Sequence, residues 1–263
     1  MNPRQLALEV LRLADPIAKA AQARALAGGL RPGDIDPAQV LPDPGGLPGR
    51  PDRPALLPAR QVPSRSAFTP EGRAALLHSI AHIEFNAINL ALDAAFRFDG
   101  MPVDFYADWL RVAGEEALHF GLLREHLQSL GFDYGDFDAH DGLWQMTQRT
   151  AGDVVARMAL VPRTLEARGL DATPPLQAKF ARAGDTRTVE ILDIILRDEV
   201  GHVAVGNHWY RWLCRRDGLD PIAHYAVLAE RHEAPKLRPP FNWAAREAAG
   251  FTADELAFLR EPG

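Results

Sequence analysis

Two sets of side chains that commonly bind metal ions recur along this chain. Each set consists of a lone glutamate followed by a Glu-x-x-His motif. The first set is Glu84, Glu116 and His119, and the second set is Glu166, Glu199 and His202. The lone glutamate precedes the motif glutamate by 32 residues in the first set and by 33 in the second. This matched spacing predicts two helical hairpins that place their ligands at corresponding heights.

The spacing within each motif suits metal coordination. Residues three apart on a helix lie on one face, about 5 to 6 Å apart, so one turn offers two ligands to one ion. Four carboxylates carry four negative charges, which two divalent ions would neutralise, whereas burying them without metal is costly. Carboxylate-rich ligation with one imidazole per ion suits iron or manganese better than zinc or copper(I). We therefore expect two metal ions, with iron as the first choice and manganese or a mixed Mn/Fe pair as alternatives.

The helical neighbours of these residues indicate which of them face a core. The positions around Glu84, Glu116 and Glu199 are mostly aliphatic or aromatic, which predicts that these carboxylates point inward. The pattern around Glu166 is looser, because Pro162 and Arg163 lie one turn before it. An alternative without metal is a salt-bridged polar core, which is energetically poor compared with apolar packing.

A second acidic residue directly precedes each motif glutamate. These residues are Glu115 and Asp198, and each lies four positions before its motif histidine. A metal-bound histidine usually donates its other ring N–H to an outer acceptor. We expect Glu115 and Asp198 to have this role, with a solvated surface charge as the alternative.

Composition limits the class of protein. The chain has 263 residues, a formal net charge of −6 and a single cysteine, Cys214, which excludes an internal disulfide framework. It has neither a recognisable secretory leader nor an apolar run of 18 residues, so we expect a cytoplasmic protein that does not enter a membrane. The negative charge gives no overall attraction to nucleic acid, but 29 Lys and Arg residues leave an RNA partner open.

The chain is predicted to be all-α in four parts. These are an N-terminal helical segment (1–31, interrupted near Asp15-Pro16), a proline-rich arm (32–66), a four-helix bundle (67–216) and a C-terminal helical extension (217–263). The bundle helices are expected at about 70–99, 103–130, 152–168 and 185–216, with a long crossover at 131–150 between the second and the third.

Cap signals and one proline refine these helices. Thr69 and Pro70 predict a clean start for the first bundle helix. Pro162 should kink the third helix before Glu166. In the extension, a short helix is expected near 220–233, and Thr252 with Glu255 predicts a capping box on a last helix.

The order of these motifs resembles the ferritin-like superfamily, and more closely a mostly bacterial family catalogued as domain of unknown function 455. The matching stretches lie within about residues 66–215; they are Ala81–Glu84, Phe105–His119, Tyr134–Phe137, Ala139–Trp144, Met158–Gly169 and Leu196–His202. A more distant similarity is to the di-iron tRNA hydroxylases. The resemblance implies a ferritin-like four-helix bundle with a dinuclear metal site and leaves the reaction unassigned.

We expect an O₂-dependent di-iron oxidase or hydroxylase that acts on a small molecule or on RNA. An electron donor and oligomer formation would be compatible with this function. The alternatives are a metal-handling ferroxidase or peroxide scavenger, and a non-catalytic helical interaction module. Metal content separates the last alternative from the others, and substrate-dependent O₂ consumption separates the oxidase from the metal-handling protein.

Overall fold

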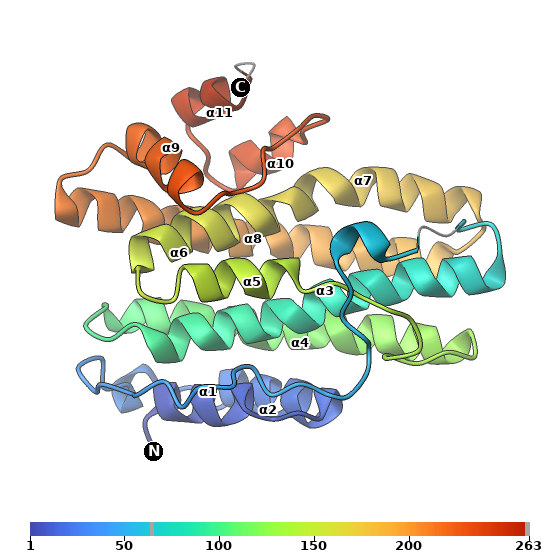
Figure 1. The fold of residues 1–263 in the computed structure, drawn as a ribbon, viewed down its shortest axis with the longest axis horizontal. Helices are drawn as coiled ribbons and strands as arrows, with labels where there is room; N and C mark the ends of the chain where they lie inside the picture. Colours follow the sequence, from blue (N-terminus) through green and yellow to red (C-terminus); the bar gives the residue numbers. More distant parts are fainter. Residues whose placement is uncertain (64–65, 261–263) are drawn as a thin grey trace. The chain divides into compact units, whose positions relative to one another are not determined.

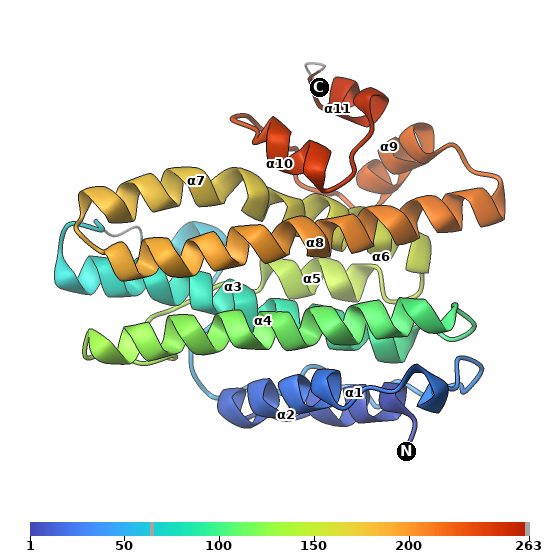
Figure 2. The ribbon, with the colours of Figure 1, turned by 180° about the vertical axis from the view of Figure 1, so that it is seen from behind.

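The computed structural model describes residues 1–63 and 66–260, and these residues form helices joined by loops (Figures 1 and 2). Within these two ranges there is no β-strand, and the residues Leu56 and Ala139 make a single isolated bridge. The prediction of an all-α protein is therefore confirmed. Among the described residues, no helix is both long and apolar enough to cross a membrane.

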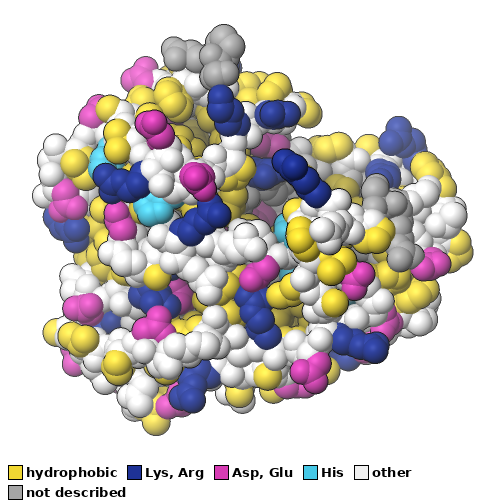
Figure 3. All heavy atoms as spheres, viewed as in Figure 1, with side chains coloured by type: hydrophobic (Ala, Val, Ile, Leu, Met, Phe, Trp, Pro, Cys, Tyr) yellow, Lys and Arg dark blue, Asp and Glu magenta, His cyan; other side chains and the backbone are white. Residues whose placement is uncertain are grey.

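The chain folds into two compact units. The first comprises residues 1–144 and 179–191, and the second comprises 145–178 and 192–263. The predicted boundaries of the bundle, 67–216, therefore include parts of both units. On the face drawn in Figure 3, Lys and Arg side chains are interspersed with Asp and Glu.

The first unit is built around a hairpin of two long helices, α3 (Pro70–Arg97) and α4 (Val103–Ser129), which pack along their lengths. The hydroxyl of Thr69 accepts a hydrogen bond from the N–H of Gly72, and Pro70 is the first helical residue, so the predicted cap is confirmed. Most residues of α3 and the apolar face of α4 are buried, and Glu84, Glu116 and His119 are among the buried residues.

Two N-terminal helices cover the hairpin. They are α1 (Pro3–Leu11), which packs on α3, and α2 (Pro16–Gly28), which packs on α4. The break between them begins at Asp15, whose carboxylate caps α2, as the Asp15-Pro16 sequence predicts. Gly114 allows the close approach of α2 to α4, because a Cβ there would lie 2.5 Å from that of Ala27.

The proline-rich arm lies along the first unit. Its described part contains only two short 3₁₀ turns, Pro32–Asp34 and Ala59–Gln61. The backbone N–H of Leu57 donates to the carbonyl of Ala139 (2.8 Å), and the N–H of Ala139 donates to that of Ala55 (2.9 Å). The arm is thus held in an extended conformation by the loop that follows α4.

That loop lies in the region of the expected crossover, 131–150. The second half of this region forms a helix, α5 (Gly142–Arg149), which was not predicted. Trp144 and Met146 on this helix are buried. The segment is only eight residues long, and a helix of this length is marginal in isolation, so the packing of Trp144 and Met146 stabilises it.

The third predicted helix is also longer than expected. It consists of α6 (Val154–Leu160), a π-helical segment (Val161–Glu166) and α7 (Ala167–Arg182), so the predicted end at residue 168 is wrong. The π-helical segment begins next to Pro162, where a proline cannot donate to the carbonyl four residues earlier.

Helix α7 continues through Pro174 and Pro175, which would ordinarily end a helix. The Nδ2 atom of Asn242 donates to the carbonyl of Leu170 (3.2 Å), the group that lacks its helical donor because residue 174 is proline. The hydroxyl of Thr173 donates to the carbonyl of Gly169 (2.8 Å). These tertiary and side-chain bonds maintain the helix, and the local sequence does not reveal the first of them.

The remaining helices belong wholly or mostly to the second unit. They are α8 (Thr186–Asp217), α9 (Pro221–Arg231), α10 (Trp243–Ala248) and α11 (Ala253–Arg260). The capping box is confirmed, since the N–H of Thr252 donates to the carboxylate of Glu255 (2.8 Å) and the N–H of Glu255 to the hydroxyl of Thr252 (3.3 Å). Helix α10 was not predicted; its cap is the side chain of Asn242.

Candidate metal centre

The first ligand set lies inside the α3–α4 hairpin of the first unit. Glu84 is 4% exposed, and Glu116 and His119 are fully buried. The Nδ1 atom of His119 lies 3.1 Å from Oε2 of Glu84 and 3.3 Å from Oε2 of Glu116. One ligand atom from each of the three residues lies within 4.8 Å of the other two. The structure therefore brings together all three residues of this set.

The apolar surroundings of this group follow from the helical pattern. On α3, Ala81 and Ile88 flank Glu84 on the same face and are fully buried. The rings of Phe85 and Phe120, which are the chain neighbours of Glu84 and His119, pack with centroids 5.4 Å apart. These side chains exclude water from the carboxylates and the imidazole, which strengthens electrostatic interactions within the group.

Burial changes the proton affinities of this group. Burial itself, and then the charge of Glu116, raise the pKa of Glu84 well above its usual range. Burial alone would lower the pKa of His119, but hydrogen bonds to Glu116 and Glu84 and their negative charges outweigh it and raise that pKa. Both pKa shifts favour proton binding by the group, because two negative carboxylates are costly to bury without positive charge beside them.

The donor set fits a divalent cation. Two carboxylates supply hard oxygen ligands and two negative charges, and the imidazole supplies one nitrogen. One divalent ion would neutralise the group, and a protonated His119 is the other way to supply positive charge between the same oxygens. A buried Glu/His group of this kind could hold a metal ion. The ligand types alone leave the identity of the ion open.

The second ligand set lies in the second unit, on the π-helical segment and α8. Glu199 and His202 are buried, and His202 Nδ1 lies 3.4 Å from Glu199 Oε1. Glu166 is also buried and is the last residue of the π-helical segment. A Cβ at Gly169 would lie 4.0 Å from Oε2 of Glu199, so this carboxylate lies against α7 one turn beyond Glu166. All three predicted residues are thus inward-facing.

The two outer acidic residues are half-buried. Glu115 lies on α4, and Asp198 lies on α8. The carboxylate of Asp198 accepts hydrogen bonds from Nε (2.8 Å) and Nη2 (3.1 Å) of Arg197. Their predicted role as acceptors for the ligand histidines stays a prediction.

Sequence reasoning missed a buried ion pair next to Glu166. Arg163 interrupts the apolar pattern of the third helix, yet it is 5% exposed and its Nη2 lies 2.9 Å from Oε1 of Glu255. Glu255 was predicted only as part of a capping box, a role that it also has. The two residues are far apart in the sequence, and neither local pattern indicates the other.

Comparisons with known proteins show which family this chain resembles but assign no function. The model of a family described as "Protein of unknown function (DUF455)" matches residues 12–257. A Haemophilus influenzae protein described as "Uncharacterized protein" is 54% identical over 218 residues, which cover 80% of this chain and 76% of that protein. No solved structure matches this chain.

Proposed function

We propose that this chain, which belongs to the family described as protein of unknown function DUF455, is a metal-dependent oxidoreductase that uses O₂ to oxidise an organic substrate. Two metal ions would bind per chain, held by the six residues of the two ligand sets. The observation that carries this proposal is the buried group of Glu84, Glu116 and His119, whose ligand atoms lie within 4.8 Å of one another.

The energetics of burial support metal binding over a purely structural role. Polar groups of this kind could be replaced by apolar side chains of similar volume at little cost or with a gain in stability. Here two carboxylates and an imidazole are buried together within the α3–α4 hairpin, beside apolar residues such as Ala81 and Ile88. The same residue types are buried in the second unit, where Glu199 and His202 form a second pair.

The ligand chemistry supports iron, with manganese or a mixed pair as alternatives. The sets are rich in carboxylate oxygen, carry one imidazole each and contain no thiolate. When bound, iron would supply the electron transfer to O₂ that amino-acid side chains do not provide. The protein's own contribution would be to hold the oxygen and nitrogen ligands in place and to keep bulk water away, which the apolar neighbours of Glu84 support.

Each residue would have a defined part in this function. Glu84 and Glu116 would bind the ion of the first set through carboxylate oxygens, and His119 would bind it through the Nδ1 atom that faces both carboxylates. Protons held by this group in the absence of metal would leave when an ion binds, because ligands coordinate in their deprotonated forms.

Oxygen consumption tests the proposed reaction. Iron-loaded protein would be reduced without air and mixed with O₂ in a stopped-flow spectrometer, and metabolites and RNA from a deletion strain would be compared with the parent. We expect a rapid absorbance change and a substrate that accumulates in the deletion strain. A lack of reaction with both O₂ and peroxide would contradict the proposed oxidoreductase activity.

The same experiment distinguishes the metal-handling alternative. If the protein turns over peroxide or Fe²⁺ rapidly while no oxidised organic product forms, a ferroxidase or scavenger replaces the oxidase. The matched control is the double variant Glu116→Ala/Glu199→Ala, which removes one carboxylate from each ligand set and whose helical content is checked by circular dichroism.

A further inference from the structure

We infer that the C-terminal extension positions Glu166 for metal binding, and that it does so through Arg163. Glu255 on α11 and Tyr225 on α9 are the positioning residues of the extension. This inference rests on the proposed function in one respect, namely that Glu166 is a metal ligand. It assigns a role to a part of the chain that contributes none of the six ligands.

The segment that carries Glu166 has an irregular backbone. Residues Val161–Glu166 form a π-helical stretch, a conformation that is rare and occurs frequently at functional sites. Within it, Arg163 and Thr164 are buried. Because irregular backbone of this kind lacks the regular α-helical bonds, its position depends on side-chain contacts with neighbouring elements.

Arg163 makes the first of these contacts. Its Nη1 donates to Oδ1 of Asn207 (2.7 Å), and its Nη2 pairs with Oε1 of Glu255 (2.9 Å). Its guanidinium also lies over the ring of Phe251, 4.8 Å from the centroid. A buried guanidinium requires a charged partner, so loss of the Glu255 charge would leave Arg163 uncompensated and free the segment to shift.

Thr164 and Pro162 make the second and third contacts. The hydroxyl of Thr164 lies 3.0 Å from that of Tyr225 and donates to the carbonyl of Ala159 (2.8 Å). Pro162 fits against Gly206 on α8 so closely that a Cβ at Gly206 would lie 2.6 Å from the Cβ of Pro162. Three consecutive residues of the segment are therefore each fixed by a different partner.

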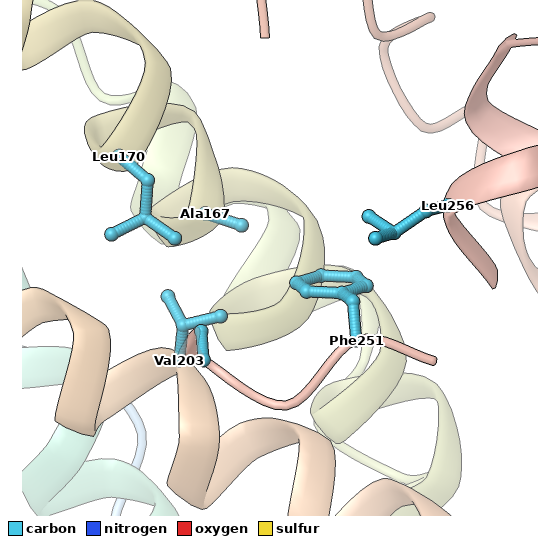
Figure 4. Packing of buried hydrophobic residues seen from close by; sticks show 6 residues of the cluster. Ala167, Leu170, Val203, Phe251 and Leu256 are labelled. Atoms are coloured by element: carbon cyan, nitrogen blue, oxygen red, sulfur yellow. The ribbon is translucent and has the colours of Figure 1, made fainter. Parts of the chain in front are cut away.

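The extension is anchored on the other side of Glu166 as well. Phe251 and Leu256 pack in one cluster with Ala167, Leu170 and Val203, and Figure 4 shows these side chains converging.

A buried ion pair adds to this apolar contact. Arg246 on α10 pairs with Asp171 on α7 at 2.6 Å. The extension thus contacts Arg163 and Thr164 before Glu166 and residues 167–171 after it. A carboxylate between two fixed stretches is pre-oriented, and supporting residues of this kind commonly change metal affinity by about 10- to 100-fold.

The test measures the affinity of the full chain for Mn²⁺ and Fe²⁺ by competition with a chelator, under anaerobic conditions for Fe²⁺. Glu199→Ala identifies the ion of interest, because this variant should lose it. In Glu255→Gln, we expect the affinity for that ion to fall about 10-fold or more, and the affinity for the other ion to equal that of the wild type. Tyr225→Phe, which removes one hydroxyl, should weaken the same ion by a smaller factor. Glu247→Gln, at an exposed position on α10, should bind both ions as the wild type does.

The selectivity between the two ions separates positioning from general stabilisation. If Glu255→Gln fails to fold, as judged by circular dichroism, the metal affinities of Tyr225→Phe test the inference instead. Wild-type affinity for both ions in both variants, or equal weakening of both ions, would overturn the inference while leaving the proposed function intact. A wild-type protein that binds no ion at the second set would overturn both.

Discussion

The Nδ1 atom of His119 lies 3.1 Å from the Oε2 atom of Glu84, although the residues belong to different helices and are 35 positions apart. Both side chains are buried, and Oε2 of Glu116 lies 3.3 Å from the same nitrogen. The α3–α4 hairpin therefore adds Glu84 from α3 to the Glu116–His119 pair that helix geometry already places on one face of α4.

Removing one carboxylate from this group should remove one metal ion. We predict that Glu116→Ala lowers the metal content of iron-loaded protein from about two ions per chain to about one, because the first set then offers only two donors. Elemental analysis of the purified variant measures this.

The control for this prediction is Glu125→Ala, which removes an exposed carboxylate from the same helix and should leave the metal content unchanged. An unchanged metal content in Glu116→Ala itself would show that this glutamate is not a ligand.

Asp198 offers a separate test of the outer acidic residues. We predict that Asp198→Asn keeps the fold and weakens metal binding by about 10- to 100-fold, since a neutral amide orients a ligand histidine less well than a carboxylate. A chelator competition measures the affinity. Asp193→Asn, an exposed change on the same helix, serves as the control. Equal affinities in the two variants would return Asp198 to the role of a surface charge paired with Arg197.

The contact between α8 and the π-helical segment predicts that alanine at two glycines of α8 changes the free energy of unfolding in opposite directions. Gly206→Ala should lower the free energy of unfolding by about 1 to 3 kcal/mol, because its Cβ would overlap Pro162. Gly201→Ala meets no atom within 4 Å and should raise that free energy by up to about 1 kcal/mol through helix propensity. Urea unfolding of the metal-free variants measures both, and similar midpoints would contradict the close packing.

The hydrogen bonds of Arg4 indicate how the N-terminal segment stabilises the first unit. Its buried guanidinium donates to the carbonyls of Ala95, Phe96 and Gln39, at 3.3, 3.0 and 2.6 Å. Arg4→Met should therefore lower the free energy of unfolding by about 3 kcal/mol, because several carbonyls lose their donor. Thermal unfolding compared with Arg24→Ala, an exposed change on α2, measures the effect, and equal melting temperatures would contradict it.

The sequence predicted those features that depend on local signals. The Thr69 cap, the capping box of Thr252 and Glu255, and the inward face of Glu84 each follow from residues within one or two helical turns. The ligand set of the first unit was predicted because two motifs repeat at matched spacing, which is a local signal that occurs twice.

The features that were missed depend on contacts between distant residues. The course of α7 through Pro174 depends on a hydrogen bond from Asn242 to Leu170. The burial of Arg163, which the helical pattern marked as a break, depends on Glu255. A charged side chain, or a backbone group that lacks its helical hydrogen bond, can be buried only when another residue pairs with it. The sequence alone does not identify that residue.

The metal content of the wild-type protein tests the central claim most directly. The protein would be loaded with Fe²⁺ without air, freed of loosely bound metal by gel filtration and analysed for iron and manganese by mass spectrometry. Two sets of buried ligands predict about two ions per chain. A content below about half an ion per chain after careful loading would contradict metal binding, since the six ligands should together hold two ions.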